Sequence, residues 1–155
     1  MNIYIYTDGA CKGNPGPGGW AIAAYAEECE TPMHEQYAHN ESTTNNQMEL
    51  TAVINALAYM CLANKTAKYY ICTDSAYIVN CFANKWYEQW EANGWKNAKK
   101  QPVANKVLWE IILQLYRGAI RQGYNFRIVK VAGHSVNQRN NYVDKLAVKA
   151  SKENK

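Results

Sequence analysis

The chain has 155 residues, of which 48% are apolar and 19% charged, and its formal charge is +4. This length is typical of one domain with a single core, and the composition excludes a disordered or low-complexity chain. We expect a single domain over residues 1–151, followed by a short disordered basic tail over 152–155.

The compartment is predicted from the cysteines and from the apolar runs. The five cysteines are odd in number and form no CxxC or zinc-type pattern, so we interpret them as reduced packing residues. No apolar run approaches the ~20 residues of a membrane span, and the first residues lack the pattern of a secretion signal. We therefore expect a cytoplasmic protein without membrane association.

The N-terminal third of the chain predicts a three-stranded antiparallel meander. Residues 2–7 alternate isoleucine with tyrosine, which is the period of a strand, and the pattern ends at Asp8. Residues 13–19 are mostly glycine and proline, which predicts a tight turn and excludes a regular strand there. Two further strands are expected over 20–29 and about 35–41.

The rest of the chain alternates helices with two more strands. From about Asn45 apolar residues recur every three or four positions, which predicts a helix of some four turns with Thr43 or Thr44 as N-cap. The later elements are expected as a strand over 68–73, helices over 76–83 and 85–92, a basic loop over 95–102, a helix over 103–122, a strand over 124–131 and a helix over 138–151. This order predicts an α/β fold with one five-stranded mixed sheet, in which the meander joins two parallel strands, flanked by helices.

Charge is distributed unevenly along the chain. Nine Lys or Arg residues and one acid lie between Glu91 and Asp144, so this segment carries +8 and the remainder carries −4. A basic face of this kind suits a polyanion, although solvated lysines on helices are also common.

Four acids occupy positions that suggest a shared site. Asp8 and Asp74 follow predicted buried strands, Glu49 lies beside the apolar stripe of the first helix, and Asp144 lies early in the last one. Singly, each has an ordinary role as a turn, capping or surface ion-pair residue. Together they would collect in the crevice at the carboxyl ends of the strands, where a cation offsets their repulsion. Oxygen ligands favour Mg²⁺ or Mn²⁺, and a hard metal beside a basic face suggests phosphodiester chemistry.

Five ordered motifs resemble those of type 1 ribonuclease H. They are TDGACKGNPGPGGW at 7–20, TTNNQMEL at 43–50, TDS at 73–75, GHS at 133–135 and NNYVD at 140–144. The resemblance covers nearly the whole chain and implies the ribonuclease H-like fold. It implies an endoribonuclease that hydrolyses the RNA strand of RNA–DNA hybrids and leaves 5′-phosphate and 3′-hydroxyl ends.

The resemblance also implies the catalytic set. Asp8, Glu49, Asp74 and Asp144 would hold two Mg²⁺ ions, with Mn²⁺ as a possible substitute and Asp8 as the bridging ligand. Two such ions can activate the attacking water and stabilise the leaving 3′ oxygen. His134 would assist proton transfer or product release; without the motif it would be interpreted as a surface loop histidine.

Substrate contacts are implied for two groups of residues. The first group would read backbone and 2′-hydroxyls across the minor groove, and it comprises Asn14, Thr44, Asn45 and Asn46, with Thr44 on a DNA-strand phosphate. The two neighbouring asparagines could instead be plain helix-capping residues. The second group lies on a basic protrusion, expected over residues 85–106, and comprises Trp86, Trp95, Lys96, Lys99 and Lys100. Packing within the protrusion explains Trp86 at least as well as substrate contact does.

This protrusion departs from the best-known bacterial pattern. Glu88 and Glu91 bring negative charge into a region that is basic in that pattern, and Ala76 replaces a residue that is often polar. We therefore expect activity with lowered affinity for the hybrid.

Two other function classes remain in competition. A non-catalytic hybrid-binding module of the same fold is disfavoured because all four acids are present. An integrase-like or resolvase-like enzyme acting on DNA is disfavoured by Asn14 and the Asn45-Asn46 pair. For the leading interpretation we expect a monomer without an obligate protein partner.

Overall fold

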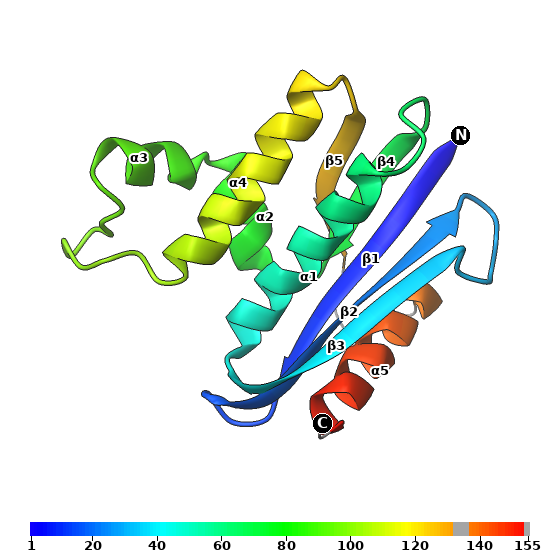
Figure 1. Cartoon of the computed structure of the whole chain (residues 1–155), viewed down its shortest axis with the longest axis horizontal. Coiled ribbons are helices and arrows are strands. Elements are labelled where there is room, and N and C mark those ends of the chain that lie inside the picture. The colour runs from blue at the N-terminus through cyan, green and yellow to red at the C-terminus, as the bar shows by residue number, and fades with distance from the viewer. Residues whose placement is uncertain (132–136, 154–155) are drawn as a thin grey trace.

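The computed structural model describes residues 1–131 and 137–153, which form one sheet and five helices (Figure 1). The elements in chain order are β1 (Asn2–Cys11), β2 (Gly16–Ala26), β3 (His34–Thr43), α1 (Asn45–Cys61), β4 (Lys68–Thr73), α2 (Ala76–Ala83), α3 (Trp86–Ala92), α4 (Lys106–Arg121), β5 (Asn125–Lys130) and α5 (Gln138–Lys152). The strand order is β3-β2-β1-β4-β5. The first three strands pair antiparallel, and β4 pairs parallel with both β1 and β5, which confirms the predicted mixed sheet.

Helices cover both faces of the sheet, and the alternation along β1 explains how the core divides between them. Ile3 and Ile5 pack in the larger cluster beneath α1 and α4. Tyr6 belongs to the smaller cluster on the opposite face, where Val143 and Ala147 of α5 cover the sheet. Because successive strand residues point to opposite faces, one alternating segment supplies both cores.

Helix α1 is the main support of the central strands. Thr44 caps it, because the Thr44 hydroxyl accepts from the backbone N–H of Gln47. In return, the side-chain oxygen of Gln47 accepts from the backbone N–H of Thr44, which completes a capping box. Leu50, Val53 and Leu57 on its inner face are fully buried. Burial of each such side chain stabilises the fold by about 1.5–3 kcal/mol.

The glycine-rich segment extends further into the sheet than the sequence indicated. Residues 16–19 belong to β2, where Gly18 and Gly19 pair with the end of β1, so the prediction of a turn throughout 13–19 was wrong. A Cβ at Gly19 would lie 2.5 Å from the backbone nitrogen of Ser151. Glycine is therefore needed in this strand because the end of α5 lies directly on its backbone.

Two helix boundaries also differ from the prediction. Helix α4 begins at Lys106 rather than at 103, because Asn105 adopts a left-handed backbone conformation with φ of 64°. Helix α5 continues through Lys152, so that residue is helical and does not belong to a disordered tail.

The five cysteines are all free. None of the helices in the described part of the chain is long and apolar enough to cross a membrane.

Candidate active site

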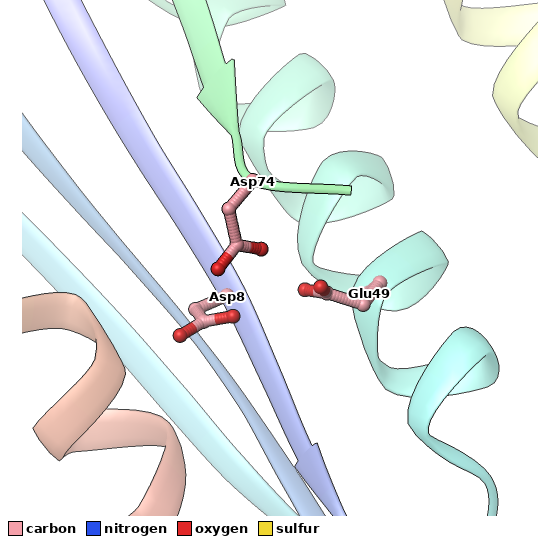
Figure 2. A group of neighbouring side chains, drawn as sticks. All are labelled: Asp8, Glu49 and Asp74. Atoms are coloured by element: carbon pink, nitrogen blue, oxygen red, sulfur yellow. The ribbon is translucent and has the colours of Figure 1, made fainter. Parts of the chain in front are cut away.

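Three acidic side chains meet at the centre of the sheet. Asp8 of β1, Glu49 of α1 and Asp74 after β4 each offer a carboxylate oxygen, and these oxygens lie within 4.8 Å of one another. Figure 2 shows the three carboxylates turned toward one another from three separate elements. Asp8 is 3% exposed and Glu49 is 5% exposed. The sequence-predicted grouping of these three acids is therefore present in the fold.

The end of β4 creates the space for this cluster. Strand β1 pairs with β4 only as far as Tyr6 opposite Cys72, and then continues beside β2 to Cys11. Asp8 therefore lies within its strand, and the prediction that the strand stops there was wrong. The parallel neighbour is the strand that ends: β4 stops at Thr73, so Asp74 follows at the level of Asp8. Asp8 thus lies where β1 has an antiparallel neighbour on one side and a terminating parallel one on the other.

Gly9 allows α1 to approach β1 closely enough for Glu49 to join the cluster. A Cβ at position 9 would lie 2.5 Å from the backbone nitrogen of Glu49 and 2.6 Å from the carbonyl carbon of Met48. Real Cβ atoms do not approach backbone atoms this closely, so any larger residue would push the two elements apart. The backbone contact at Gly9 therefore sets the distance between Asp8 and Glu49.

The fourth acid, Asp144, lies beside Asp8. It lies in the second turn of α5, the helix that packs against β1 and β2. Its carboxyl group lies close enough to that of Asp8 to raise the pKa of Asp8. Alternation along β1 places Asp8 on the same face as Tyr6, and this is the face that α5 covers.

Burial and mutual repulsion make two of these acids hard to ionise. The pKa of Asp8 is raised to about 8, first by burial and then by the neighbouring Asp144 carboxyl group and the charges of Asp74 and Asp144. The N–H of Gly9, which donates to Asp8 Oδ1 at 2.9 Å, acts in the opposite direction. Burial also raises the pKa of Glu49 well above its ordinary value, with the charges of Asp8 and Asp74 as the next causes.

The arrangement fits a hard divalent cation. Glu49 Oε1 is buried and receives no hydrogen bond from the described residues, so it has an unused lone pair facing a cluster of like charges. A cation there would satisfy that oxygen and remove the repulsion that raises both pKa values. The carboxylate donors suit Mg²⁺ or Mn²⁺ rather than a metal that prefers sulfur or imidazole.

A second group of predicted residues lines one cavity. Its volume is about 310 Å³, and its walls are Asn14, Thr44, Asn45, Asn46, Ala104 and Asn105. The first four were predicted as substrate contacts, and the fold brings them together from two separate segments. Asn105 was missed, although an asparagine just before a helix is a recognisable signal, because the helix was expected to begin at 103. The side-chain amide of Gln47 donates to Asn105 Oδ1 at 3.3 Å, which connects this residue to the capping box of α1.

The predicted contacts on the protrusion divide into two kinds. Lys96, Lys99 and Lys100 are exposed on the loop between α3 and α4. Trp86 and Trp95 are partly buried, and their rings pack against Trp90 at centroid distances of 6.5 and 5.9 Å. Their packing within the protrusion is thus explained, and their contact with substrate stays a prediction. His134 lies outside the described residues.

Comparison with known proteins identifies the family. The family model RNase H matches residues 1–152. "Ribonuclease H" of Syntrophomonas wolfei is 44% identical over 151 residues, covering 97% of this chain and 96% of that protein. "Ribonuclease H" of Moorella thermoacetica is 43% identical over 146 residues, covering 94% of this chain and 88% of that protein.

Solved structures agree with this assignment. LC9-RNase H1, described as a type 1 RNase H with the type 2 active-site motif, matches with a TM-score of 0.76 and 27% identity, over 97% of this chain and 72% of that one. The fold is also that of LC11-RNase H1 in complex with RNA/DNA hybrid, with a TM-score of 0.68 and 24% identity, over 96% of this chain and 95% of that one. Given a matching family model over almost the whole length and relatives of about the same length, the chain belongs to the RNase H family.

Proposed function

We propose that this protein hydrolyses the RNA strand of RNA–DNA hybrids with two divalent metal ions and leaves 5′-phosphate and 3′-hydroxyl ends. The observation that carries the proposal is the cluster of Asp8, Glu49 and Asp74, which Asp144 joins through Asp8. Family membership supports it, and the structure of LC11-RNase H1 with an RNA/DNA hybrid supports the choice of substrate.

The four carboxylates have separate tasks in this proposal. Asp8 is central, because it lies beside both Asp74 and Asp144, and the N–H of Gly9 orients its carboxylate. Glu49 offers its unsatisfied Oε1 from the opposite face. The Mg²⁺ ions held there would activate the attacking water and stabilise the leaving 3′ oxygen. Because Asp8 and Glu49 have raised pKa values, ion binding must displace protons from the cluster.

Two surfaces are proposed to hold the substrate. The cavity lined by Asn14, Thr44 and Asn105 offers amide and hydroxyl groups to the sugar–phosphate backbone, and the loop lysines offer positive charge to phosphates. In the proposal both surfaces contact the sugar–phosphate backbone rather than the bases. We therefore expect recognition of the hybrid by its shape and backbone, with little dependence on sequence.

The direct test is cleavage of labelled duplexes of one sequence. The RNA strand of the RNA–DNA hybrid should be cut with Mg²⁺ or Mn²⁺ present and not with EDTA, whereas duplex RNA and duplex DNA should remain intact. Fragment ends should be 5′-phosphate and 3′-hydroxyl, as read by kinase and phosphatase treatment. Metal-dependent binding without cleavage would instead favour the non-catalytic module, and cleavage of duplex DNA would favour a DNA nuclease.

Replacement of Gly9 by alanine should lower kcat on the hybrid by about 10–100-fold, because a shift of about 1 Å between catalytic groups has that effect. The reason is the predicted collision of the new Cβ with the backbone of Glu49. Gly118→Ala is the matched control, since a Cβ there meets only the end of the Arg121 side chain, at 3.8 Å. Equal kcat values for the two variants would show that the contact at Gly9 does not set the geometry.

Replacement of Lys96, Lys99 and Lys100 together by alanine should flatten the salt dependence of hybrid binding. Removing one lysine–phosphate interaction should reduce the slope of log K against log salt by about 0.9, so the full effect is a change of about 3 if all three lysines bind phosphate. Binding measured by fluorescence anisotropy over a salt series gives this slope. Lys65→Ala is the control, because Lys65 is exposed in the α1–β4 turn, far along the chain from the protrusion. An unchanged slope would remove the three lysines from the interface.

A further inference from the structure

The loop that carries Lys96, Lys99 and Lys100 is hydrogen-bonded to the end of helix α3. The backbone N–H of Trp95 donates to the carbonyl of Trp90 at 2.6 Å. The Asn93 side chain accepts from the N–H of Lys96 and donates to the Lys96 carbonyl, at 3.0 and 2.9 Å. These bonds tie the first lysine of the loop directly to the end of α3.

The same loop is closed upon itself. The side chain of Asn97 accepts from the backbone N–H groups of Lys99 and Gln101, at 2.9 and 3.0 Å, and the Asn97 N–H donates to the Gln101 carbonyl at 2.8 Å. Lys99 and Lys100 therefore stand on a folded turn. Helix α3 and residues 93–105, which make up the protrusion in the structure, are joined by these hydrogen bonds, so the position of the lysines depends on that of the helix.

The protrusion extends away from the sheet in Figure 1 and is joined to α4 through side chains. One contact is aromatic, between Trp90 and Trp109, with ring centroids 5.7 Å apart. Beside it lies a cavity of about 400 Å³, whose lining includes Trp95 of the protrusion and Gln114 of α4. Apolar packing of this kind is non-directional, so it holds α3 close to α4 but fixes its orientation less strictly than hydrogen bonds do.

The directional contact between the two helices is an ion pair. The two terminal nitrogens of Arg117 on α4 each donate to one carboxylate oxygen of Glu91 on α3, both at 2.7 Å. It is the one ion pair among residues 1–131 and 137–153. The Arg117 guanidinium also lies over the ring of Tyr87, 5.5 Å from its centroid. Arg117 thus holds α3 at two positions one turn apart, and a two-bond planar contact fixes orientation as well as distance.

We propose that Glu91 and Arg117 are positioning residues that set the orientation of the protrusion and thereby hold Lys96, Lys99 and Lys100 in place for the hybrid. The inference rests on the proposed function, because it concerns how that substrate is held. It reverses the interpretation of Glu91 as an acid that only weakens a basic surface. The pair is partly exposed, at 36% for Glu91 and 41% for Arg117, so its main effect is on orientation and its effect on total stability is small.

The two interpretations of Glu91, as an unfavourable charge or as a positioning residue, predict opposite changes in KM for Glu91→Gln. Removal of a negative charge beside three lysines should by itself lower KM for the hybrid. Loss of positioning should instead raise KM about threefold with kcat unchanged, which is the size expected for a partly exposed two-bond pair. Glu88→Gln is the matched control, because it removes the same charge from the same helix and Glu88 forms no ion pair within the described residues. Its KM should be equal to that of the parent or lower.

Two further variants separate positioning from simple loss of charge. Arg117→Gln should raise KM as Glu91→Gln does, and the two changes combined should cost no more than either alone. The exchanged pair, Glu91→Arg with Arg117→Glu, keeps the net charge and should restore KM to within about twofold of the parent. A KM for Glu91→Gln that is equal to or below the parent value would overturn the proposal. An equal rise in KM for Glu88→Gln would do the same.

Hydrogen exchange tests the positioning without any substrate. The backbone amides of Trp95 and Gln101 should exchange faster in Glu91→Gln than in Glu88→Gln, because the protrusion loses its directional tie to α4. Equal exchange in the two variants would overturn the proposal even if the hybrid is cleaved. A parent protein that leaves the hybrid intact with Mg²⁺ and Mn²⁺ would contradict the proposed function alone, and the exchange rates would still decide whether the pair positions the protrusion.

Discussion

Asp8→Asn should abolish cleavage of the RNA–DNA hybrid, with kcat at least about 1,000-fold lower, because the proposed metal site would lose a carboxylate that would hold the ions, and with it several kcal/mol of transition-state stabilisation. Asp8 has this effect because it lies beside both Asp74 and Asp144. The measurement is single-turnover cleavage of a labelled hybrid with saturating enzyme. Hybrid binding should change little, since the loop lysines and the Asn14 cavity are intact.

The same variant should be more stable than the parent in the absence of metal. Asn has nearly the shape of Asp and no charge, so it removes the buried carboxylate that raises the free energy of the folded state. Because the pKa of Asp8 is raised to about 8, the gain near neutral pH should be at least about 1.4 kcal/mol, which corresponds to one pKa unit. Chemical denaturation in EDTA measures it. An inactive variant that is also less stable would point to a folding defect, and parent-like cleavage would contradict the assignment of Asp8.

The metal-free protein should lose stability as the pH rises, and Mg²⁺ should reverse the loss. Asp8 and Glu49 both have raised pKa values in the folded state, so between their unfolded pKa values and their folded ones the folded protein binds more protons than the unfolded chain. Their favourable contribution is complete below a pH of about 4 and is lost as the pH rises through about 8 for Asp8. The slope should approach about 1.4 kcal/mol per pH unit for each group that titrates alone.

Chemical denaturation in EDTA at pH values from about 4 to about 8 measures this pH dependence, and the series is then repeated with saturating Mg²⁺. In the proposal the metal binds the ionised cluster, so the fall in stability toward high pH should shrink or vanish in its presence. Asp8→Asn in EDTA is the control and should show a shallower fall. A metal-free parent whose stability increases from acidic to alkaline pH would contradict the raised pKa values.

Several elements could be predicted from local sequence because local physics determines them. The strand Lys68–Thr73 was predicted with its boundaries, since a short run of β-favouring residues ends at Asp74-Ser75. The start of α1 was predicted from the change to a helical period near Asn45 and from Thr43 or Thr44 as N-cap, and in the structure Thr44 is the cap. Such signals involve atoms that are neighbours in the chain, and they act before any tertiary contact is made.

Predictions failed where a distant segment decides the local conformation. Residues 16–19 look like a turn by composition, yet they form strand because β1 and β3 pair with them and α5 lies against Gly19. Residues 103–105 look like the start of a helix. The helix instead begins at Lys106, since Val103 is buried and its N–H donates to the carbonyl of Trp95 in the protrusion. In each case long-range pairing outweighed local propensity.

The acids show most clearly what the sequence alone determined and what required the tertiary structure. Residue type, order and motif resemblance were sufficient to name Asp8, Glu49, Asp74 and Asp144 and to predict a hard metal. Their depth of burial, the closeness of three of them and the raised pKa values depend on how β1, β4 and α1 pack. Similarly, Glu91 is an unfavourable charge in the sequence and an ion-pair partner in the fold, because Arg117 lies 26 residues away along the chain. Desolvation and charge pairing are determined by distances in space, and these exist only after the chain has folded.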